Sequence, residues 1–526
     1  MSPVSAGCMW AGLLFLLLHI PSTMLYAADC IRLENLYIED AGLIDQSKQA
    51  RWQAEFSGQC VDRNLISAVL RSINSDLLQQ GYVTSRAFIE PQDVRNGVLT
   101  ISIFPGRIER IVEKPQMETT GLTASAFFGQ QGQVLNLRDL ETALETIERL
   151  PSVSAEFDIV PSEQKGYSEI AVKLRETRKW RLQLGFSFNN DDNEPKTTIS
   201  YRQDNPFRIN DQLRIGYNDD SLRSSTQGNE GWELGYEFPL GAYLLDIAVD
   251  DLSYKRWVSG INDRYLSEGD TRSLSLAVSK TVFRDQDDRA TVGLALAHKK
   301  TATYFAGERI DVSSFKTTVA DLSLSHTRLG SWGSLVSTIR LYQGLDWFGA
   351  REDDYFGQES GLEDDAVLQF TKWTLTERLS MPFAHSRWIW RSQLQVQYAD
   401  DLLYSSEQIS VGSLYTVRGY QVPLSGSRGY FFRNDLVRTF TEEPTDPFDT
   451  QPRSKRLSWH VGLDYGEVAC RGGQNESCGV VAGLGLGFDL SSKHFQMALR
   501  WGYPLKDMSY ETADNGRFDA FVTWMF

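Results

Sequence analysis

Few residue patterns in this sequence could carry out enzymatic chemistry. The chain has no GxxxxGK(S/T) loop for a nucleotide phosphate, no HExxH or CxxC metal motif and no GxSxG nucleophile elbow. Gly483 to Gly487 reads GLGLG, but an unbroken strand period runs through it, which excludes a dinucleotide-binding loop. We therefore expect no enzyme, no catalytic residues, no metal site and no cofactor. The histidines beyond the N-terminal segment are scattered: His298, His326, His385, His460 and His494.

The cysteines indicate disulfide bonds instead. Beyond Cys8 the sequence has Cys30, Cys60, Cys470 and Cys478, which form two local pairs at opposite ends of the chain. This arrangement favours Cys30–Cys60 and Cys470–Cys478 disulfides in an oxidising compartment. Other pairings of the same cysteines stay open, because sequence alone does not decide connectivity. No histidine clusters near either pair, which argues against zinc.

Composition narrows the class of protein. The 526 residues include 53 Lys plus Arg and 69 Asp plus Glu, a net charge of −16. Such an acidic chain is poorly suited to nucleic acid, whose phosphates need a basic surface. No segment after the N-terminal one approaches the ~18 consecutive apolar residues that a membrane helix needs. A β-barrel remains compatible with the composition, because its strands are apolar on one face only.

The N-terminal segment predicts export. Residues 11–20 read AGLLFLLLHI and are followed by Pro21 and by the small residues Ala27 and Ala28. This pattern indicates a signal peptide over residues 1–27, cleaved near Ala27. The segment has no Lys or Arg, and a buried N-terminal helix is the alternative.

Two αβ domains are expected next, over residues 28–106 and 107–176. The first has apolar residues four apart between residues 62 and 81, which predicts a helix, followed by a strand at 98–104. The second repeats the order, with a helix at 136–150 that Pro151 ends and a final pair of strands. These domains are either generic periplasmic modules or sheets whose exposed edges accept an extended client segment.

From residue 177 to 526, apolar and polar residues alternate with the period of two that is typical of barrel strands. In KWRLQLGFSF, the apolar Trp180, Leu182 and Leu184 alternate with polar residues, as expected between lipid and a polar lumen. Short turns alternate with long polar gaps, among them residues 254–271, 300–314 and an inserted loop at 399–428. The gap at 441–455 is long where a short turn is expected. We predict about 16 antiparallel strands in a transmembrane barrel in the outer membrane.

The last strand carries aromatic residues on one face. Phe518, Trp524 and Phe526 share that face in GRFDAFVTWMF. We interpret them as a signal for the barrel assembly machinery; the alternative is an ordinary final strand with an apolar face.

Four motifs resemble one family in their order along the chain. GYVTSRAFIEPQDVRNGVLTISIFPGRIERI, Gly81 to Ile111, resembles the first POTRA domain of two-partner secretion transporters, the TpsB-type haemolysin secretion/activation family. DNPFRINDQL (204–213) resembles an early barrel turn, SVGSLYTVRGY (410–420) the inserted loop, and GLDYG (462–466) the strand that faces that loop. The resemblance covers essentially the whole chain after the signal peptide.

The resemblance implies an internal ion pair. In this family the arginine of the VRGY tetrad reaches into the barrel and pairs with the strand aspartate, which here are Arg418 and Asp464. A guanidinium in a lumen of lowered dielectric favours a bidentate carboxylate. Val417, Gly419 and Tyr420 complete the tetrad, in which glycine supplies backbone freedom and tyrosine both packs and hydrogen-bonds. A surface turn with a solvated arginine is the alternative.

The resemblance also implies function and partners. It predicts a transporter, expected as a monomer, that recognises a large exoprotein through its POTRA domains and translocates it unfolded. The exoprotein would be a haemolysin, an adhesin or a contact-dependent inhibition toxin with an N-terminal secretion domain. Outer-membrane lipid, lipopolysaccharide and the assembly machinery are further expected partners. An insertase of the same superfamily and an outer-membrane enzyme such as a phospholipase are the alternatives.

One departure from the family concerns the plug. Some relatives carry a plug helix before the first POTRA domain, but here strand-like CIRLENLYI begins at Cys30, close to the expected cleavage point. We therefore expect the loop around Arg418 to supply most of any plug.

Overall fold

The computed structural model describes the greater part of the chain. The expected signal peptide and nearly all of the 441–455 gap lie outside the described residues. The described residues are 30–39, 42–115, 117–189, 195–220, 228–260, 263–352, 366–383, 387–441, 456–470, 476–508 and 516–526.

The first of two compact units runs to Leu77 and resumes over Arg86–Phe104. Its three-stranded sheet has the order β1-β3-β2, with β1 parallel and β2 antiparallel to β3. In α2 the apolar residues four apart, such as Val69 and Ile73, are fully buried, as their spacing predicts. The elements are β1 (Asn35–Glu39), α1 (Gln46–Phe56), α2 (Arg63–Gln79), β2 (Arg86–Phe88) and β3 (Val98–Phe104).

The second unit begins with a similar αβ domain. Its sheet has the order β4-β6-β5, with β4 parallel and β5 antiparallel to β6. Asn136 caps α4 by accepting a 2.8 Å hydrogen bond from the Arg138 amide, and Leu140 and Ile147 turn its apolar face into the core. The elements are β4 (Arg107–Lys114), α3 (Gly121–Ala126), α4 (Leu137–Glu148), β5 (Val153–Pro161) and β6 (Tyr167–Glu176).

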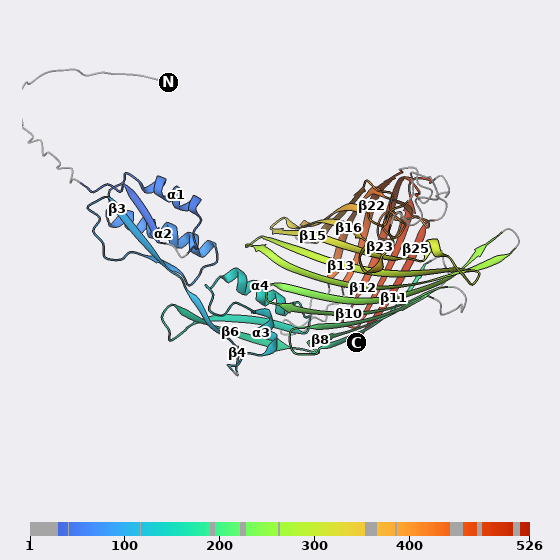
Figure 1. Cartoon of the computed structure of the whole chain (residues 1–526), viewed down its shortest axis with the longest axis horizontal. Coiled ribbons are helices and arrows are strands. Elements are labelled where there is room, and N and C mark those ends of the chain that lie inside the picture. Colours follow the sequence, from blue (N-terminus) through green and yellow to red (C-terminus); the bar gives the residue numbers. More distant parts are fainter. Residues whose placement is uncertain are drawn as a thin grey trace, which may run out of the picture. The chain divides into compact units, whose positions relative to one another are not determined.

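The same unit continues into a closed antiparallel barrel, which confirms the predicted fold class (Figure 1). Sixteen strands form the ring, which closes where β25 pairs with β7, and the two-residue β14 (Glu308–Arg309) pairs only with β13. The ring strands are β7 (Trp180–Asn189), β8 (Lys196–Asp204), β9 (Gln212–Asp219), β10 (Gly228–Leu240), β11 (Tyr243–Ser259), β12 (Arg264–Arg284), β13 (Asp288–Phe305), β15 (Lys316–Gly330), β16 (Gly333–Leu345), β17 (Thr371–Phe383), β18 (Trp388–Ala399), β21 (Arg428–Thr441), β22 (Arg456–Ala469), β23 (Gly479–Ser491), β24 (Phe495–Pro504) and β25 (Arg517–Met525).

The strand alternation sorts side chains as the sequence predicts. Outward residues such as Trp232, Leu234 and Leu294 are about half exposed to the surroundings of the barrel. Their neighbours Glu233 and Gly293 belong to the opposite, lumenal face. No helix in the described part of the chain is long and apolar enough to cross a membrane.

The predicted long polar gap at 254–271 is wrong, and the one at 300–314 begins too early, because the connection to β15 starts only after Phe305. Residues 254–271 are mostly strand, because β11 and β12 stay paired from Tyr254↔Gly269 to Ser259↔Arg264. Residues 300–305 likewise continue β13. These long strands reach past their neighbours (Figure 1). Where both faces of a hairpin meet water, polar residues occupy both faces, so the alternation disappears although the backbone pairing continues.

Candidate functional site

The inserted loop between β18 and β21 lies inside the barrel, against the inner surface of the barrel wall. It contains a short hairpin of β19 (Ile409–Val411) and β20 (Leu424–Gly426). Apolar side chains from the loop and from the strands form one buried cluster: Ile409, Val411, Val417, Tyr420, Leu424, Phe431, Val468, Val481 and Met508. The loop is thus held against the wall by a hydrophobic core that it shares with the strands.

Arg418 is a buried charged residue of this loop. Only 1% of its surface is exposed, and it makes a bidentate pair with Asp464, from Nε to Oδ2 at 2.6 Å and from Nη2 to Oδ1 at 2.7 Å. The Arg418 backbone amide donates to the same carboxylate at 3.1 Å. The structure therefore brings together the two residues that the family resemblance pairs.

A second carboxylate, which the sequence did not single out, completes the pair. Arg418 Nη1 donates to Asp435 Oδ1 at 2.7 Å, and Arg433 Nε donates to Asp435 Oδ2 at 3.2 Å. Two guanidinium and two carboxylate groups thus balance their charges. This balance is essential, because a buried charge without a partner carries a large desolvation cost. We call Arg418, Asp435, Asp464 and Arg433 the loop lock.

Glycines of two adjacent strands, β22 and β23, make room for the lock. A Cβ atom added at Gly462 would lie 1.9 Å from Arg418 Nη2, and one at Gly485 would lie 2.3 Å from its Cζ. At Gly483 the same atom would lie 2.0 Å from the Arg418 carbonyl oxygen. GLGLG, which the sequence marks only as strand, therefore forms a slot that larger residues would fill.

The neighbouring tetrad residues anchor the loop tip. Gly419 has a φ of 106°, a left-handed conformation that other residues rarely adopt, and a Cβ there would lie 2.4 Å from the Pro504 nitrogen. The Tyr420 hydroxyl lies 2.8 Å from the Lys506 carbonyl oxygen and accepts a bond from the Ala482 amide at 3.1 Å. Val417 is fully buried in the loop's apolar cluster.

A second site joins the second αβ domain to the barrel. The 204–213 motif forms the tight turn between β8 and β9, in which Asn205 and Asn210 have φ values of 53° and 63°. Asn210 Nδ2 donates to the Thr146 carbonyl of α4 at 3.0 Å, and the Asp204 carboxylate accepts from the Ser152 amide at 3.2 Å. The motif that resembles a barrel turn thus also docks α4.

Arg149, at the C-terminal end of α4, reaches from the helix to the barrel. It pairs with Glu237 of β10 and donates to the Asn210 carbonyl oxygen at 2.5 Å. Burial lowers the pKa of Arg149 to about 10, which leaves its guanidinium charged at neutral pH. Arg214 lies 3.7 Å from the same glutamate, so Glu237 links the helix to β9 as well.

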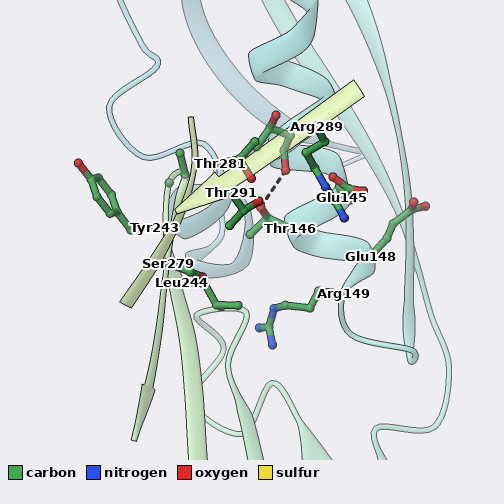
Figure 2. Close-up of a pocket in the computed structure, with 13 residues that line it drawn as sticks. Glu145, Thr146, Glu148, Arg149, Tyr243, Leu244, Ser279, Thr281, Arg289 and Thr291 are labelled. Carbon is green, nitrogen blue, oxygen red and sulfur yellow. Dashed lines mark hydrogen bonds and ion pairs between the residues drawn. The ribbon is translucent and has the colours of Figure 1, made fainter. Parts of the chain in front are cut away.

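One turn earlier on α4, Glu145 makes two further ion pairs with the barrel. It pairs with Arg284 at the end of β12 and with Arg289 of β13, the latter at 2.7 Å. Figure 2 shows Glu145 and Arg149 on the helix face directed toward these strands. The ion pairs of Arg149 and Glu145, with the turn contacts of Asn210, constitute what we call the α4 joint.

The remaining predicted residues lie as follows. Phe518 and Trp524 are outward residues of β25, and Trp524 makes edge contacts with Phe186 and Phe495. The Phe526 amide donates to the Leu182 carbonyl oxygen at 2.9 Å, which continues the closing ladder. Disulfides join Cys30 to Cys60 and Cys470 to Cys478. Within the described ranges, no group of side chains could hold a metal ion.

Comparison with known families matches both αβ domains and most of the barrel. Residues 166–490 match the family described as haemolysin secretion/activation protein ShlB/FhaC/HecB. Residues 31–106 match the ShlB-type POTRA domain, and residues 107–161 match a further POTRA domain.

Individual relatives agree with the family match. The outer membrane transporter CdiB of Dickeya dadantii is 29% identical over 77% of this chain and 72% of its own length. The hemolysin transporter protein ShlB of Serratia marcescens is 25% identical over 90% of this chain and 83% of its own length. The solved structure of CdiB from Escherichia coli has the same fold, with a TM-score of 0.83, 24% identity and coverage of 97% of this chain and 93% of that one.

The glycine slot predicts that Gly485→Ala destabilises the barrel. The added Cβ would push the Arg418 guanidinium away from both carboxylates, and breaking a buried pair costs about 3–5 kcal/mol. We expect the barrel to lose its resistance to SDS at a lower temperature, measured by heat-modifiable gel mobility. Gly216→Ala is the matched control, since its Cβ would meet only Glu233, at 3.3 Å. Equal shifts for both variants would show that the slot has no special role.

The α4 joint predicts that Arg149→Gln loosens helix α4. Loss of the Glu237 pair removes a charged hydrogen bond worth about 1.5–3 kcal/mol, so exchange of α4 amides should accelerate about tenfold or more. Hydrogen exchange with mass spectrometry on the full-length protein measures this. Arg110→Gln, which removes an exposed pair with Glu169 in the same domain, should leave α4 exchange unchanged. Unchanged exchange in Arg149→Gln would contradict the joint.

Proposed function

Because this chain belongs to the haemolysin secretion/activation protein ShlB/FhaC/HecB family, we propose that it recognises a large exoprotein in the periplasm and translocates it unfolded to the cell surface. It is an outer-membrane protein transporter, with a barrel in the membrane and POTRA domains in the periplasm. We also propose that the exoprotein is a haemolysin, an adhesin or a contact-dependent inhibition toxin. The observation that carries the proposal is the loop lock, a charged closure inside the lumen.

We assign the parts of the chain accordingly. Residues 1–27 are the signal peptide, 28–106 and 107–176 the two POTRA domains, and 177–526 the barrel with its inserted loop at 399–428. The aromatic face of Phe518, Trp524 and Phe526 is the signal for barrel assembly. The transporter acts as a monomer, contacts lipopolysaccharide with its outer surface and has no enzymatic activity.

Recognition of the exoprotein uses the sheet edges of the POTRA domains. In the second POTRA domain the order β4-β6-β5 leaves β5 as an edge strand of nine residues, Val153–Pro161. An edge of this length offers unpaired backbone groups to an added strand. The N-terminal secretion domain of the exoprotein supplies that strand. Backbone pairing of this kind tolerates many client sequences, because side chains do not form the bonds.

Transport requires the loop lock to open. The lock holds a guanidinium that is 1% exposed, so leaving it without partners would cost about 3–5 kcal/mol. Contacts made by the bound exoprotein offset this cost, and the loop moves aside only while a client is present. The sequence has no P-loop for ATP, so folding of the exoprotein outside the cell biases the direction of movement.

Secretion of the exoprotein tests the proposal. Arg418→Ala or Asp464→Ala leaves the remaining lock charge buried without its partner, so the loop loses the defined arrangement from which a client displaces it. Because this penalty exceeds the 1.4 kcal/mol that corresponds to a factor of ten, export should fall at least about tenfold. Export is measured by immunoblotting of the culture medium, and barrel insertion by heat-modifiable mobility.

The matched control is Arg340→Ala. Arg340 also faces the lumen and pairs with Asp321 at 2.9 Å, but its side chain is 46% exposed, so its loss should change export little. Deletion of the transporter gene should abolish export. Undiminished export in the deletion strain would refute the function and favour an insertase of the same superfamily.

A further inference from the structure

A cavity of about 400 Å³ lies between helix α4 and the barrel. Its helix side carries Glu145 and Arg149, and its barrel side carries Ser279 of β12 and Thr291 of β13 (Figure 2). The volume falls in the range of about 300–1,000 Å³ that is typical of ligand sites. The ion pairs of the α4 joint flank the cavity and do not fill it.

The barrel side of this cavity is the start of the lumenal wall. Ser279 and Thr281 alternate along β12 with Val278 and Val282, and Val282 is 54% exposed on the outer face. Thr291 pairs with Thr281 and therefore shares its lumenal face. Because α4 contacts the same ends of β12 and β13 through Glu145, the cavity lies at the periplasmic mouth of the lumen.

The two sides of the cavity differ in their free hydrogen-bonding groups. On α4, the hydroxyls of Thr142 and Thr146 donate to carbonyl oxygens of their own helix, each at 2.8 Å. On the barrel side, the hydroxyls of Ser279, Thr281 and Thr291 have no hydrogen-bond partner among the described residues. Each can both donate and accept, which suits the amide and carbonyl groups of an extended polypeptide.

Next to the cavity, β12 and β13 present short uncharged side chains to the lumen as far as Lys299 of β13, and Asp246 of β11 and Asp321 of β15 flank this stretch. Successive lumenal residues are Ala277 and Ser275 on β12, and Gly293, Ala295 and Ala297 on β13. The uncharged stretch itself does not retain acidic or basic segments of a passing chain, because it offers no charge of its own to pair with them. It is therefore tolerant of client sequence.

The opposite wall of the ring is different. In the ring order, β23 and β24 lie across from β12 and β13. A second cavity of about 370 Å³ lies there, and Arg391, Arg456, Asp489 and Arg500 line it. Arg500 Nη2 and Asp489 Oδ1 are 2.5 Å apart, and the loop lock occupies the same side of the lumen. Charged side chains in a confined lumen would retain segments of opposite charge.

We propose that the cavity between α4 and the β12–β13 wall is the entrance site for the extended backbone of the exoprotein, which then follows that wall through the lumen. This inference rests on the proposed function and specifies its route. The free hydroxyls bind backbone groups as the chain leaves water, and the uncharged stretch lets it move on. The α4 joint fixes the width of this entrance.

Site-specific photo-crosslinking in the full-length transporter tests the route. The photoreactive residue p-benzoyl-phenylalanine replaces Ser279 or Thr291 in the cavity, Ala498 in the cavity on the opposite wall, or Val292 on the outer face. The client is the exoprotein fused at its C-terminus to a tightly folded domain that stalls it in the pore. We expect several-fold more crosslinked client at Ser279 and Thr291 than at Ala498, and none at Val292.

A second variant tests the entrance without crosslinking. Ser279→Trp fills the cavity and should slow export several-fold, whereas Val278→Trp, on the outer face of the same strand, should not. Heat-modifiable mobility checks that both variants insert as barrels.

The outcomes separate the route from the function. Equal or stronger crosslinking at Ala498, or none at Ser279 and Thr291 while export proceeds, would overturn the route and leave the transporter function intact. Unchanged export in a correctly inserted Ser279→Trp variant would also overturn it. Absence of any export by the unmodified transporter would overturn the proposed function, and the route with it.

Discussion

A guanidinium buried in the barrel lumen constrains much of the surrounding structure. Arg418 is 1% exposed, so its charge must be balanced within bonding distance, and Asp464 and Asp435 supply that balance from two adjacent strands. The same guanidinium needs space, which explains why β22 and β23 present Gly462 and Gly485 to it. Loop position, strand composition and lumen closure thus follow from one ion pair. A closure built on charge is also one that competing contacts can open, unlike a purely apolar plug.

On the periplasmic side, the α4 joint likewise uses charged side chains to hold two parts of the chain together. Arg149 and Glu145 reach from one helix to three strands of the barrel, and the 204–213 turn binds the same helix through backbone groups. A domain held mainly by ion pairs and single hydrogen bonds can shift at moderate cost, since each such contact contributes only about 0.5–3 kcal/mol. The transporter therefore has a strongly held loop in the lumen and a more weakly held contact at its periplasmic mouth, where our proposal places the arriving client.

Much of this could be predicted from the sequence, and the exceptions have physical causes. Alternation and turn spacing predict the barrel because lipid and lumen impose opposite polarity on successive residues. The same signal disappears in residues 254–271, where strand pairing continues without lipid. The Arg418–Asp464 pair required the order of family motifs, since sequence distance carries no information about contacts across a barrel. Asp435 and Glu237 were missed because each is one lumenal charge among many, and only strand register shows what it faces.

The central claim is that the loop must leave its lock for export to occur, and an engineered tether tests it most directly. A Cβ at Gly466 would lie 2.5 Å from Val411 Cγ1, so Val411→Cys with Gly466→Cys places two thiols within bonding reach of the loop and β22. Exoprotein export is measured with the tether oxidised and then reduced, beside each single cysteine variant and the unmodified protein under the same reductant. The account predicts that export stops when the tether is oxidised and recovers on reduction. Export by the oxidised variant at the rate of the unmodified protein would contradict it.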